Sequence, residues 1–136
     1  MPVLPTNTAF RNALQAMTVT GVTTHYDYPP ASMGELPAAF LTVPVEGGLG
    51  EYALSCINED KTRSLVYVIC LEAVAQDNNE QNYDLIAPAM DNLESALDTT
   101  LGTLANFHEY SMTAGEFTVS GNAYWSIIAT VSIRSV

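Results

Sequence analysis

The sequence predicts a single α+β domain, spanning residues 1–136, on a mainly antiparallel or mixed β-sheet. A short N-terminal helix and one longer helix, at about 83–104, are expected to pack on that sheet. Three observations predict this class. The 136 residues, 48% apolar and 14% charged, are enough to bury one core and too apolar for disorder. Several segments are rich in β-branched and aromatic residues, and two have apolar residues at helical spacing. The strand-like segments fall before and after the long helix, which is typical of α+β folds.

The first element is a helix through "TAFRNALQAM". Thr6 or Asn7 can cap it, and Phe10, Leu14 and Met17 recur at helical spacing. A strand is expected at about residues 22–28, where "TVTGVTTHYDY" turns to β-branched residues and alternation. The proline pair that follows would end it, since proline donates no hydrogen bond to a neighbouring strand.

A second strand is predicted in "AAFLTVPV", followed by "EGGLGEY" as a mobile loop. "YALSCIN" and "RSLVYVICLEAVA" then form a β-hairpin closed by "EDKT", with Ile57 opposite Ser64. The second strand of this hairpin is nearly all apolar, which favours a central strand covered on both faces. In this register Cys56 faces Leu65, too far from Cys70 for a disulfide, and both thiols are expected to be buried fillers.

The principal helix is predicted in "YDLIAPAMDNLESALDTTLGTL". Its apolar stripe comprises Ile86, Met90, Leu93, Leu97, Leu101 and Leu104. Pro88 either lies in the first turn, where its missing N–H is harmless, or kinks the helix, and we expect a short turn first and a firm helix from about Pro88 to Leu101. Strands follow at about Phe107–Met112 and Tyr124–Arg134, with a short third at Phe117–Ser120.

An acidic face runs along this helix, because Asp84, Asp91 and Asp98 recur every seven residues, with Glu94 nearby. The face either lines a lumen or meets a basic partner, or is simply solvated. Seven-residue spacing separates the carboxylates by about 10 Å along the axis, which disfavours a divalent-metal site. No metal site is therefore predicted.

The net charge of the chain argues against tight nucleic-acid binding. Fifteen Asp and Glu against four Lys and Arg give a net charge of −11, and the cations, Arg11, Lys61, Arg63 and Arg134, are scattered along the sequence. Tight binding to phosphates needs a basic surface, although an acidic wall lets DNA slide past without sticking. The chain has no basic residue before an apolar run and no apolar segment of spanning length, so we expect a soluble protein made inside the cell.

No catalytic motif is present in the sequence. His25 and His108 belong to no metalloprotease pattern, and no Gly-x-Ser-x-Gly elbow occurs. "EGGLGEY" lacks the residues that complete a phosphate-binding loop. We therefore predict neither an enzyme nor a cofactor, and structural or surface roles for both histidines.

The connection "HYDYPPASMGELPAAF" is unusually rigid and apolar. By strand alternation Tyr26 and Tyr28 should share one face, and the prolines stiffen the loop. A rigid loop loses little entropy on docking, so the segment is predicted to be a protein interface. The alternative is a loop folded over the domain's own core. The interface candidates are Tyr26, Tyr28, Pro29, Pro30, Met33 and Leu36.

Taken together, "YDYPPASMGELPAAF", a β-hairpin, "NNEQNYDLIAPAMDNLESAL" leading into a helix, and a closing β-pair resemble the tail-terminator and tail-completion proteins of long-tailed bacteriophages. The resemblance covers most of the chain in element order. It implies a non-enzymatic subunit of a hexameric ring that caps the tail tube and joins it to the head.

The implied partners are further copies of the chain, the tail tube protein and head-side neck or connector proteins. DNA would be met only in passage, and no membrane is involved. The implied location is the virion tail or neck, after assembly in the host cytoplasm. The alternatives are a head-closure or other neck protein, and a small ligand-binding module whose pocket is lined by Tyr67, Tyr124 and Trp125. An enzyme is the third hypothesis, supported only by generic carboxylates.

Overall fold

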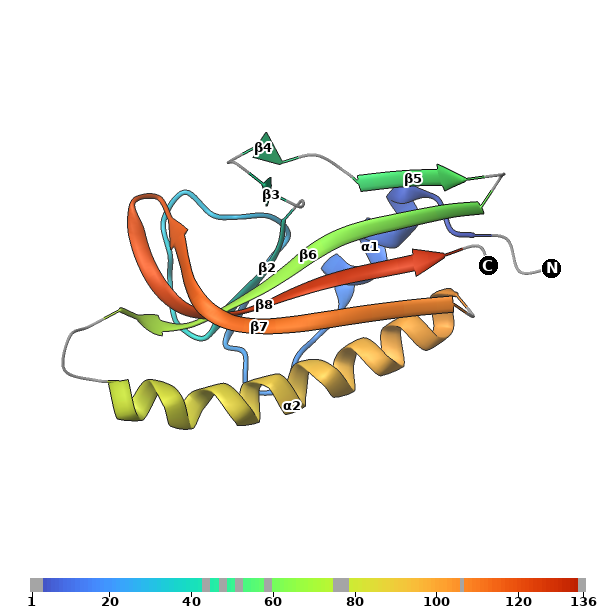
Figure 1. The fold of residues 1–136 in the computed structure, drawn as a ribbon. Helices are drawn as coiled ribbons and strands as arrows, with labels where there is room; N and C mark the ends of the chain where they lie inside the picture. Colours follow the sequence, from blue (N-terminus) through green and yellow to red (C-terminus); the bar gives the residue numbers. More distant parts are fainter. Residues whose placement is uncertain are drawn as a thin grey trace.

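Six strands form one mixed sheet, and both helices pack on the same face of it (Figure 1). The computed structural model describes residues 4–42, 45–46, 49–50, 53–57, 60–74, 79–105 and 107–134. The strand order is β1-β2-β6-β8-β7, and β5 also pairs with β6. The β1–β2 pair is parallel and the other pairs of this sheet are antiparallel, which confirms the predicted α+β class. The bounds are α1 Asn7–Ala16, β1 Thr24–Tyr26, β2 Ala38–Thr42, β3 Val45–Glu46, β4 Leu49–Gly50, β5 Ala53–Ile57, β6 Asp60–Ala73, α2 Asn79–Leu104, β7 Phe107–Val119 and β8 Asn122–Arg134.

Helix α1 forms as predicted. The Thr6 side chain caps it by accepting a hydrogen bond from the Ala9 N–H at 3.1 Å. Phe10 and Leu14 are fully buried and Met17 nearly so, because their spacing puts them on the face that meets the sheet.

Strand β6 is the central strand. It pairs with β2 and β5 along one edge and with β8 along the other. Both of its faces are buried: alternate residues from Leu65 to Leu71 face the helices, and Val66, Val68 and Cys70 face the other way. The prediction of a strand covered on both faces is confirmed.

The β5–β6 hairpin has a different register from the expected one. Strand β6 begins at Asp60, so Ile57 lies opposite Asp60, not Ser64. Asp60, Lys61 and Thr62 of "EDKT" thus belong to the strand, where they pair with Ile57, Cys56 and Ser55. Cys56 lies opposite Lys61, and nine residues of extended strand, about 30 Å, separate Lys61 from Cys70. A disulfide remains excluded, for a slightly different reason.

Helix α2 is longer than expected, because it starts at Asn79 and runs through Pro88 without a preceding turn. The prediction of a helix firm only from Pro88 was wrong. The stripe itself is confirmed: Leu93, Leu97 and Leu101 are fully buried, and the remaining members pack against the same core. Burial of this stripe outweighs the local penalty of one proline in the helix.

The C-terminal strands are also longer than predicted. Strand β7 runs unbroken from Phe107 to Val119 and pairs with β8 along its whole length. A two-residue turn at Ser120 and Gly121 joins them, with φ of 50° and 84°. These left-handed values match the turns that suit the twist of hairpins. The separate short strand at Phe117–Ser120 was therefore wrong, since cross-strand pairing carries β7 through Gly115.

Two further boundaries differ in the N-terminal half. Strand β1 spans only Thr24–Tyr26 instead of residues 22–28. The Thr23 and Thr24 N–H groups both donate to the Pro37 carbonyl, and regular pairing with β2 begins only at Thr24. The segment predicted as a mobile loop contains β4, which pairs with β3 in a separate two-stranded ladder.

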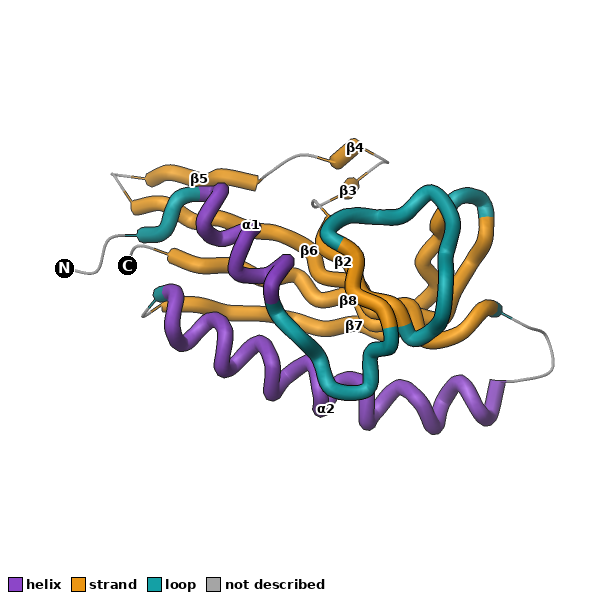
Figure 2. The backbone as a smooth tube through the Cα atoms, turned by 180° about the vertical axis from the view of Figure 1, so that it is seen from behind, coloured by secondary structure: helices purple, strands orange, loops and turns teal. Residues whose placement is uncertain are grey.

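The core has two parts, one on each side of the sheet. The larger lies between the sheet and the helices. The smaller lies beneath the curled end of the β7–β8 hairpin and the long connection between β1 and β2, seen as a teal arc in Figure 2. The rings of Phe40 and Phe117 pack there with centroids 5.7 Å apart. The Ser120 hydroxyl, at the hairpin turn, donates to the Ala31 carbonyl and so links the β7–β8 hairpin to the connection between β1 and β2.

Candidate docking surfaces

The rigid connection from Asp27 to Pro37 folds largely over the chain's own sheet. Tyr26, Met33 and Leu36 are half-buried and pack against the smaller core. The Gly34 N–H donates to the Tyr26 hydroxyl at 3.0 Å, and a Cβ at Gly34 would come within 2.9 Å of that oxygen. The alternative raised from the sequence, a loop covering its own core, thus describes these three candidates.

The remaining interface candidates face outward. Tyr28 is 72% exposed and Pro29 is exposed, whereas Pro30 is half-buried. Because β1 ends at Tyr26, Tyr28 lies beyond the strand and the expected shared face does not form. Tyr28 and Pro29 border a hollow of about 280 Å³ beside α1, together with Arg11. Their role as an interface stays a prediction.

The acidic face of α2 is solvent-exposed. Asp84, Asp91 and Asp98 are all exposed, and Glu94 lies among them. The Tyr110 hydroxyl donates to Asp98 Oδ1 at 2.7 Å. Partial burial, together with the nearby Asp98 and Glu94 carboxylates, raises the pKa of Tyr110 to about 12.

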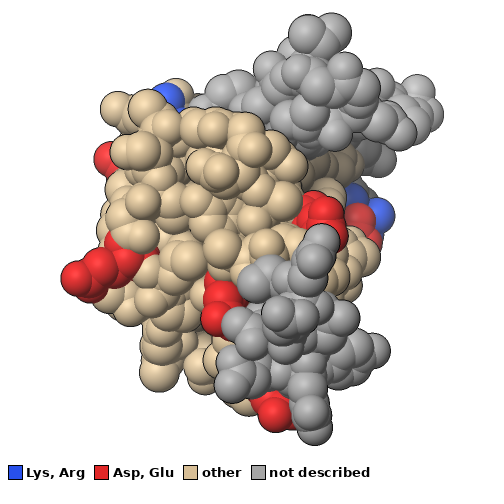
Figure 3. Space-filling view, turned by 90° about the vertical axis from the view of Figure 1, so that its left-hand side faces the viewer, with Lys and Arg blue, Asp and Glu red and all other residues tan. Residues whose placement is uncertain are grey.

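Acidic side chains also spread over the end of the molecule that carries the β7–β8 turn and the start of α2. Figure 3 looks at this end, and Lys and Arg appear only at its margins. Repulsion among so many like charges makes this end unsuited to an acidic partner.

Two arginines lie on neighbouring strands near the opposite end of the sheet, although they are far apart in the sequence. Arg63 pairs with Ile133, the residue before Arg134, so the two arginine side chains lie on opposite faces of the sheet. Arg63 Nε donates to the Pro5 carbonyl at 2.8 Å, and the helix that follows Pro5 carries Arg11. Antiparallel pairing thus brings the start of β6 beside the end of β8, while Arg63 and Arg134 remain on different faces.

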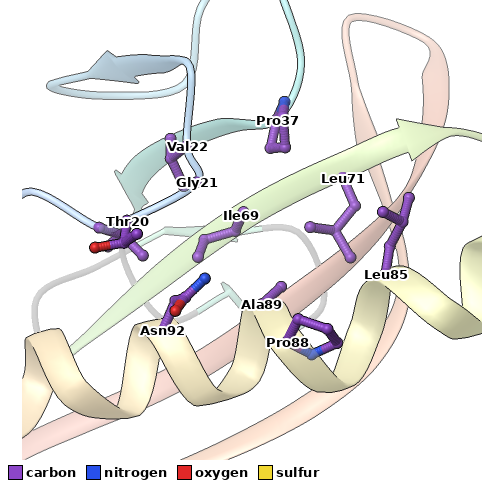
Figure 4. Close-up of a pocket in the computed structure, with 11 residues that line it drawn as sticks. Thr20, Gly21, Val22, Pro37, Ile69, Leu71, Leu85, Pro88, Ala89 and Asn92 are labelled. Atoms are coloured by element: carbon purple, nitrogen blue, oxygen red, sulfur yellow. The ribbon is translucent and has the colours of Figure 1, made fainter.

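A shallow apolar groove lies between the turn after α1, strand β6 and the first half of α2 (Figure 4). Its volume is about 180 Å³, and Asn92 and Thr20 supply its polar side chains. Leu85, at its rim, is 41% exposed. Its other walls include Val22, Leu71, Pro88 and Ala89. Sequence reasoning missed this groove, because no periodicity places residues 19–22 beside the helix.

The histidines and the buried thiol make structural contacts. The Val19 N–H donates to His25 Nε2 at 3.2 Å, and His108 Nδ1 lies 3.0 Å from the Ala105 carbonyl oxygen. Cys70 is a buried filler as predicted, and burial raises the pKa of its thiol. The side chain of Cys56 lies outside the described residues.

The aromatic pocket considered from the sequence does not form. Tyr67 belongs to the helix-side core and Tyr124 to the core on the other face, so the sheet separates them. Trp125 Nε1 is buried and has no hydrogen-bond partner among the described residues. Among the side chains that the structure describes, no three His, Cys, Asp or Glu come together as metal ligands.

The fold and surfaces define an α+β protein whose exposed features are an acidic helix face, an exposed arginine at the end of β8 and an apolar groove. The chain matches no protein-family model, and a search of curated proteins finds no similar sequence. Within the described part of the chain, no helix is long and apolar enough to span a membrane.

Proposed function

We propose that this protein is a structural subunit of a phage particle, a tail terminator that forms a ring, most simply a hexamer, on the head-proximal end of the tail tube. A head-closure or other neck protein is the nearest alternative. The observation that carries the proposal is the element order. A short helix, a long connection, the β5–β6 hairpin, α2 and the closing β7–β8 hairpin follow one another as the resemblance implies.

Two further features support a structural role. The groove in the helix layer is nearly all apolar, whereas a specific small-molecule site usually has several convergent polar groups. The aromatic residues considered as a pocket lie on opposite faces of the sheet. The surface instead offers features of opposite chemical character at separate places, which suits assembly into a larger particle.

Mass and shape in solution test the proposal. Native mass spectrometry or sedimentation across a concentration series should show a closed oligomer, and negative-stain images should show rings with a central hole. The protein should also bind the ends of purified tail tubes and stop their growth when added to polymerising tube protein. A strict monomer that neither binds tube ends nor limits tube length would overturn the proposal.

The net charge of −11 has a place in this function, because a ring lumen that repels DNA lets it pass without sticking. Asp84, Asp91 and Asp98 are the candidate lining. If Lys at all three positions leaves DNA passage through assembled particles unchanged, these residues do not line the lumen.

A further inference from the structure

An exposed aromatic residue and an exposed arginine lie side by side where β7 begins and β8 ends. Phe107, the first residue of β7, is 47% exposed. Its cross-strand partner on β8 is Arg134, also exposed. Directly paired residues have Cβ atoms about 5 Å apart, so the two side chains form one projection. Aromatic residues and arginine are the types that most often dominate binding energy at protein interfaces.

The apolar groove has the complementary character. Its volume of about 180 Å³ is similar to the ~150 Å³ of an apolar cavity that accepts benzene. Asp84 and Asp91 lie four and three residues from Pro88, which lines the groove. That spacing puts their Cβ atoms about 5–6 Å from that of Pro88. An apolar hollow therefore stands beside two exposed carboxylates.

The projection cannot reach the groove of its own chain. Phe107 follows the last residue of α2, Leu104, whereas the groove is centred near Pro88. Leu104 is sixteen positions beyond Pro88 in the helix, which is about 24 Å along the axis. A contact between the Phe107–Arg134 projection and the groove must therefore involve two chains.

We propose that a second copy of this chain docks head to tail, with its Phe107 side chain in the groove and its Arg134 guanidinium beside Asp84 and Asp91. The inference rests on the proposed ring assembly and names the surfaces that form it. A contact between two different surfaces of identical chains repeats, and it closes into a ring when its rotation closes. Such docking also sets a cation against carboxylates in a chain of net charge −11, whose copies otherwise repel.

This contact removes Asp84 and Asp91 from the lumen proposed above and leaves Asp98 and Glu94 on the free part of the acidic face. Charge reversal distinguishes the two roles. A lumen residue changes DNA passage without changing assembly, whereas a contact residue changes assembly itself.

Exchanging the charges of Arg134 and Asp91 tests the electrostatic part of the proposed contact. Arg134→Glu and Asp91→Arg should each raise the concentration at which half the protein is assembled by about fivefold or more. An equimolar mixture of the two variants should restore assembly, because alternating copies have opposite charges at every contact. Arg11→Glu and Glu116→Arg, which change the net charge by the same amounts elsewhere, should have smaller effects and should not rescue each other.

Truncation of the Phe107 side chain tests the apolar part of the proposed contact. Phe107→Ser should weaken assembly about thirtyfold, the loss typical of a central interface residue. Tyr28→Ser removes the exposed aromatic residue of the connection, which the sequence predicts as an interface, so a larger loss of assembly there than with Phe107→Ser would overturn this contact. Circular dichroism and melting temperature confirm that each variant is folded.

The outcomes separate this inference from the proposed function. Rings that form equally well with Phe107→Ser and with both charge variants would overturn the head-to-tail contact and leave the terminator role standing. A wild-type chain that stays monomeric, alone and on tube ends, would overturn both. Loss of assembly in the single variants with rescue in the mixture supports the contact.

Discussion

Pro88 provides the sharpest test of how α2 is built. It is the tenth residue of a 26-residue helix and is exposed, so its ring makes little use of the core. Proline has no N–H, so the Asp84 carbonyl lacks its intrahelical partner. Replacement by alanine should recover about 3 kcal/mol of helix stability and lose up to about 1 kcal/mol, because the unfolded chain becomes freer.

The net gain is about 2 kcal/mol. An unfolding entropy of about 2.1 cal/mol/K per residue gives about 290 cal/mol/K for 136 residues, so the melting temperature should rise by about 7 °C. Thermal unfolding followed by circular dichroism at 222 nm measures it. Pro29→Ala, in the exposed connection, is the matched control and should lower the melting temperature slightly, since only the unfolded-state effect remains. An unchanged or lower melting temperature for Pro88→Ala would show that the helix does not run through this position.

Three other changes have defined outcomes. Leu97→Ala should lower the free energy of unfolding in urea by about 3 kcal/mol, because Leu97 is fully buried; a loss below 1 kcal/mol would contradict that packing. Gly121→Ala should destabilise by about 1 kcal/mol, since its φ is 84°, whereas Gly102→Ala, with open space around it in α2, should stabilise by about as much. Burial raises the pKa of Tyr67 to about 12, because the folded state favours the protonated phenol over the phenolate. This stabilisation is complete below pH 10 and is lost as pH rises to 12, by roughly 3 kcal/mol, and Tyr67→Phe should remove that part of the pH dependence.

The elements that could be predicted are those whose secondary structure is determined by their own residues. Helix α1 follows from the Thr6 cap and the spacing of Phe10 and Leu14. The stripe of α2 and the doubly buried β6 follow from apolar periodicity, which depends on which faces meet the core. Local pattern and tertiary packing agree at these positions.

The errors occur where pairing with a distant segment outweighs local preference. Pro88 predicts a helix start, yet burial of the leucine stripe carries α2 through it. The sequence predicts separate strands at Phe107–Met112 and Phe117–Ser120, yet pairing with β8 carries β7 unbroken between them. The groove and the Phe107–Arg134 pair both depend on contacts between segments far apart in the sequence, which no single segment encodes.

The pairing of β6 with β8 also determines when this chain can fold. Thr62 lies opposite Arg134, so the central strand lacks one neighbour until residue 134 has left the ribosome. Strands β2 and β5 can join β6 early, but the apolar edge that β8 will cover stays open during synthesis of α2 and β7. The β7–β8 hairpin, closed by a two-residue turn, can form locally and dock as a unit. Nascent chains stalled before β8 should therefore be aggregation-prone and protease-sensitive, and the domain should form only in a late step.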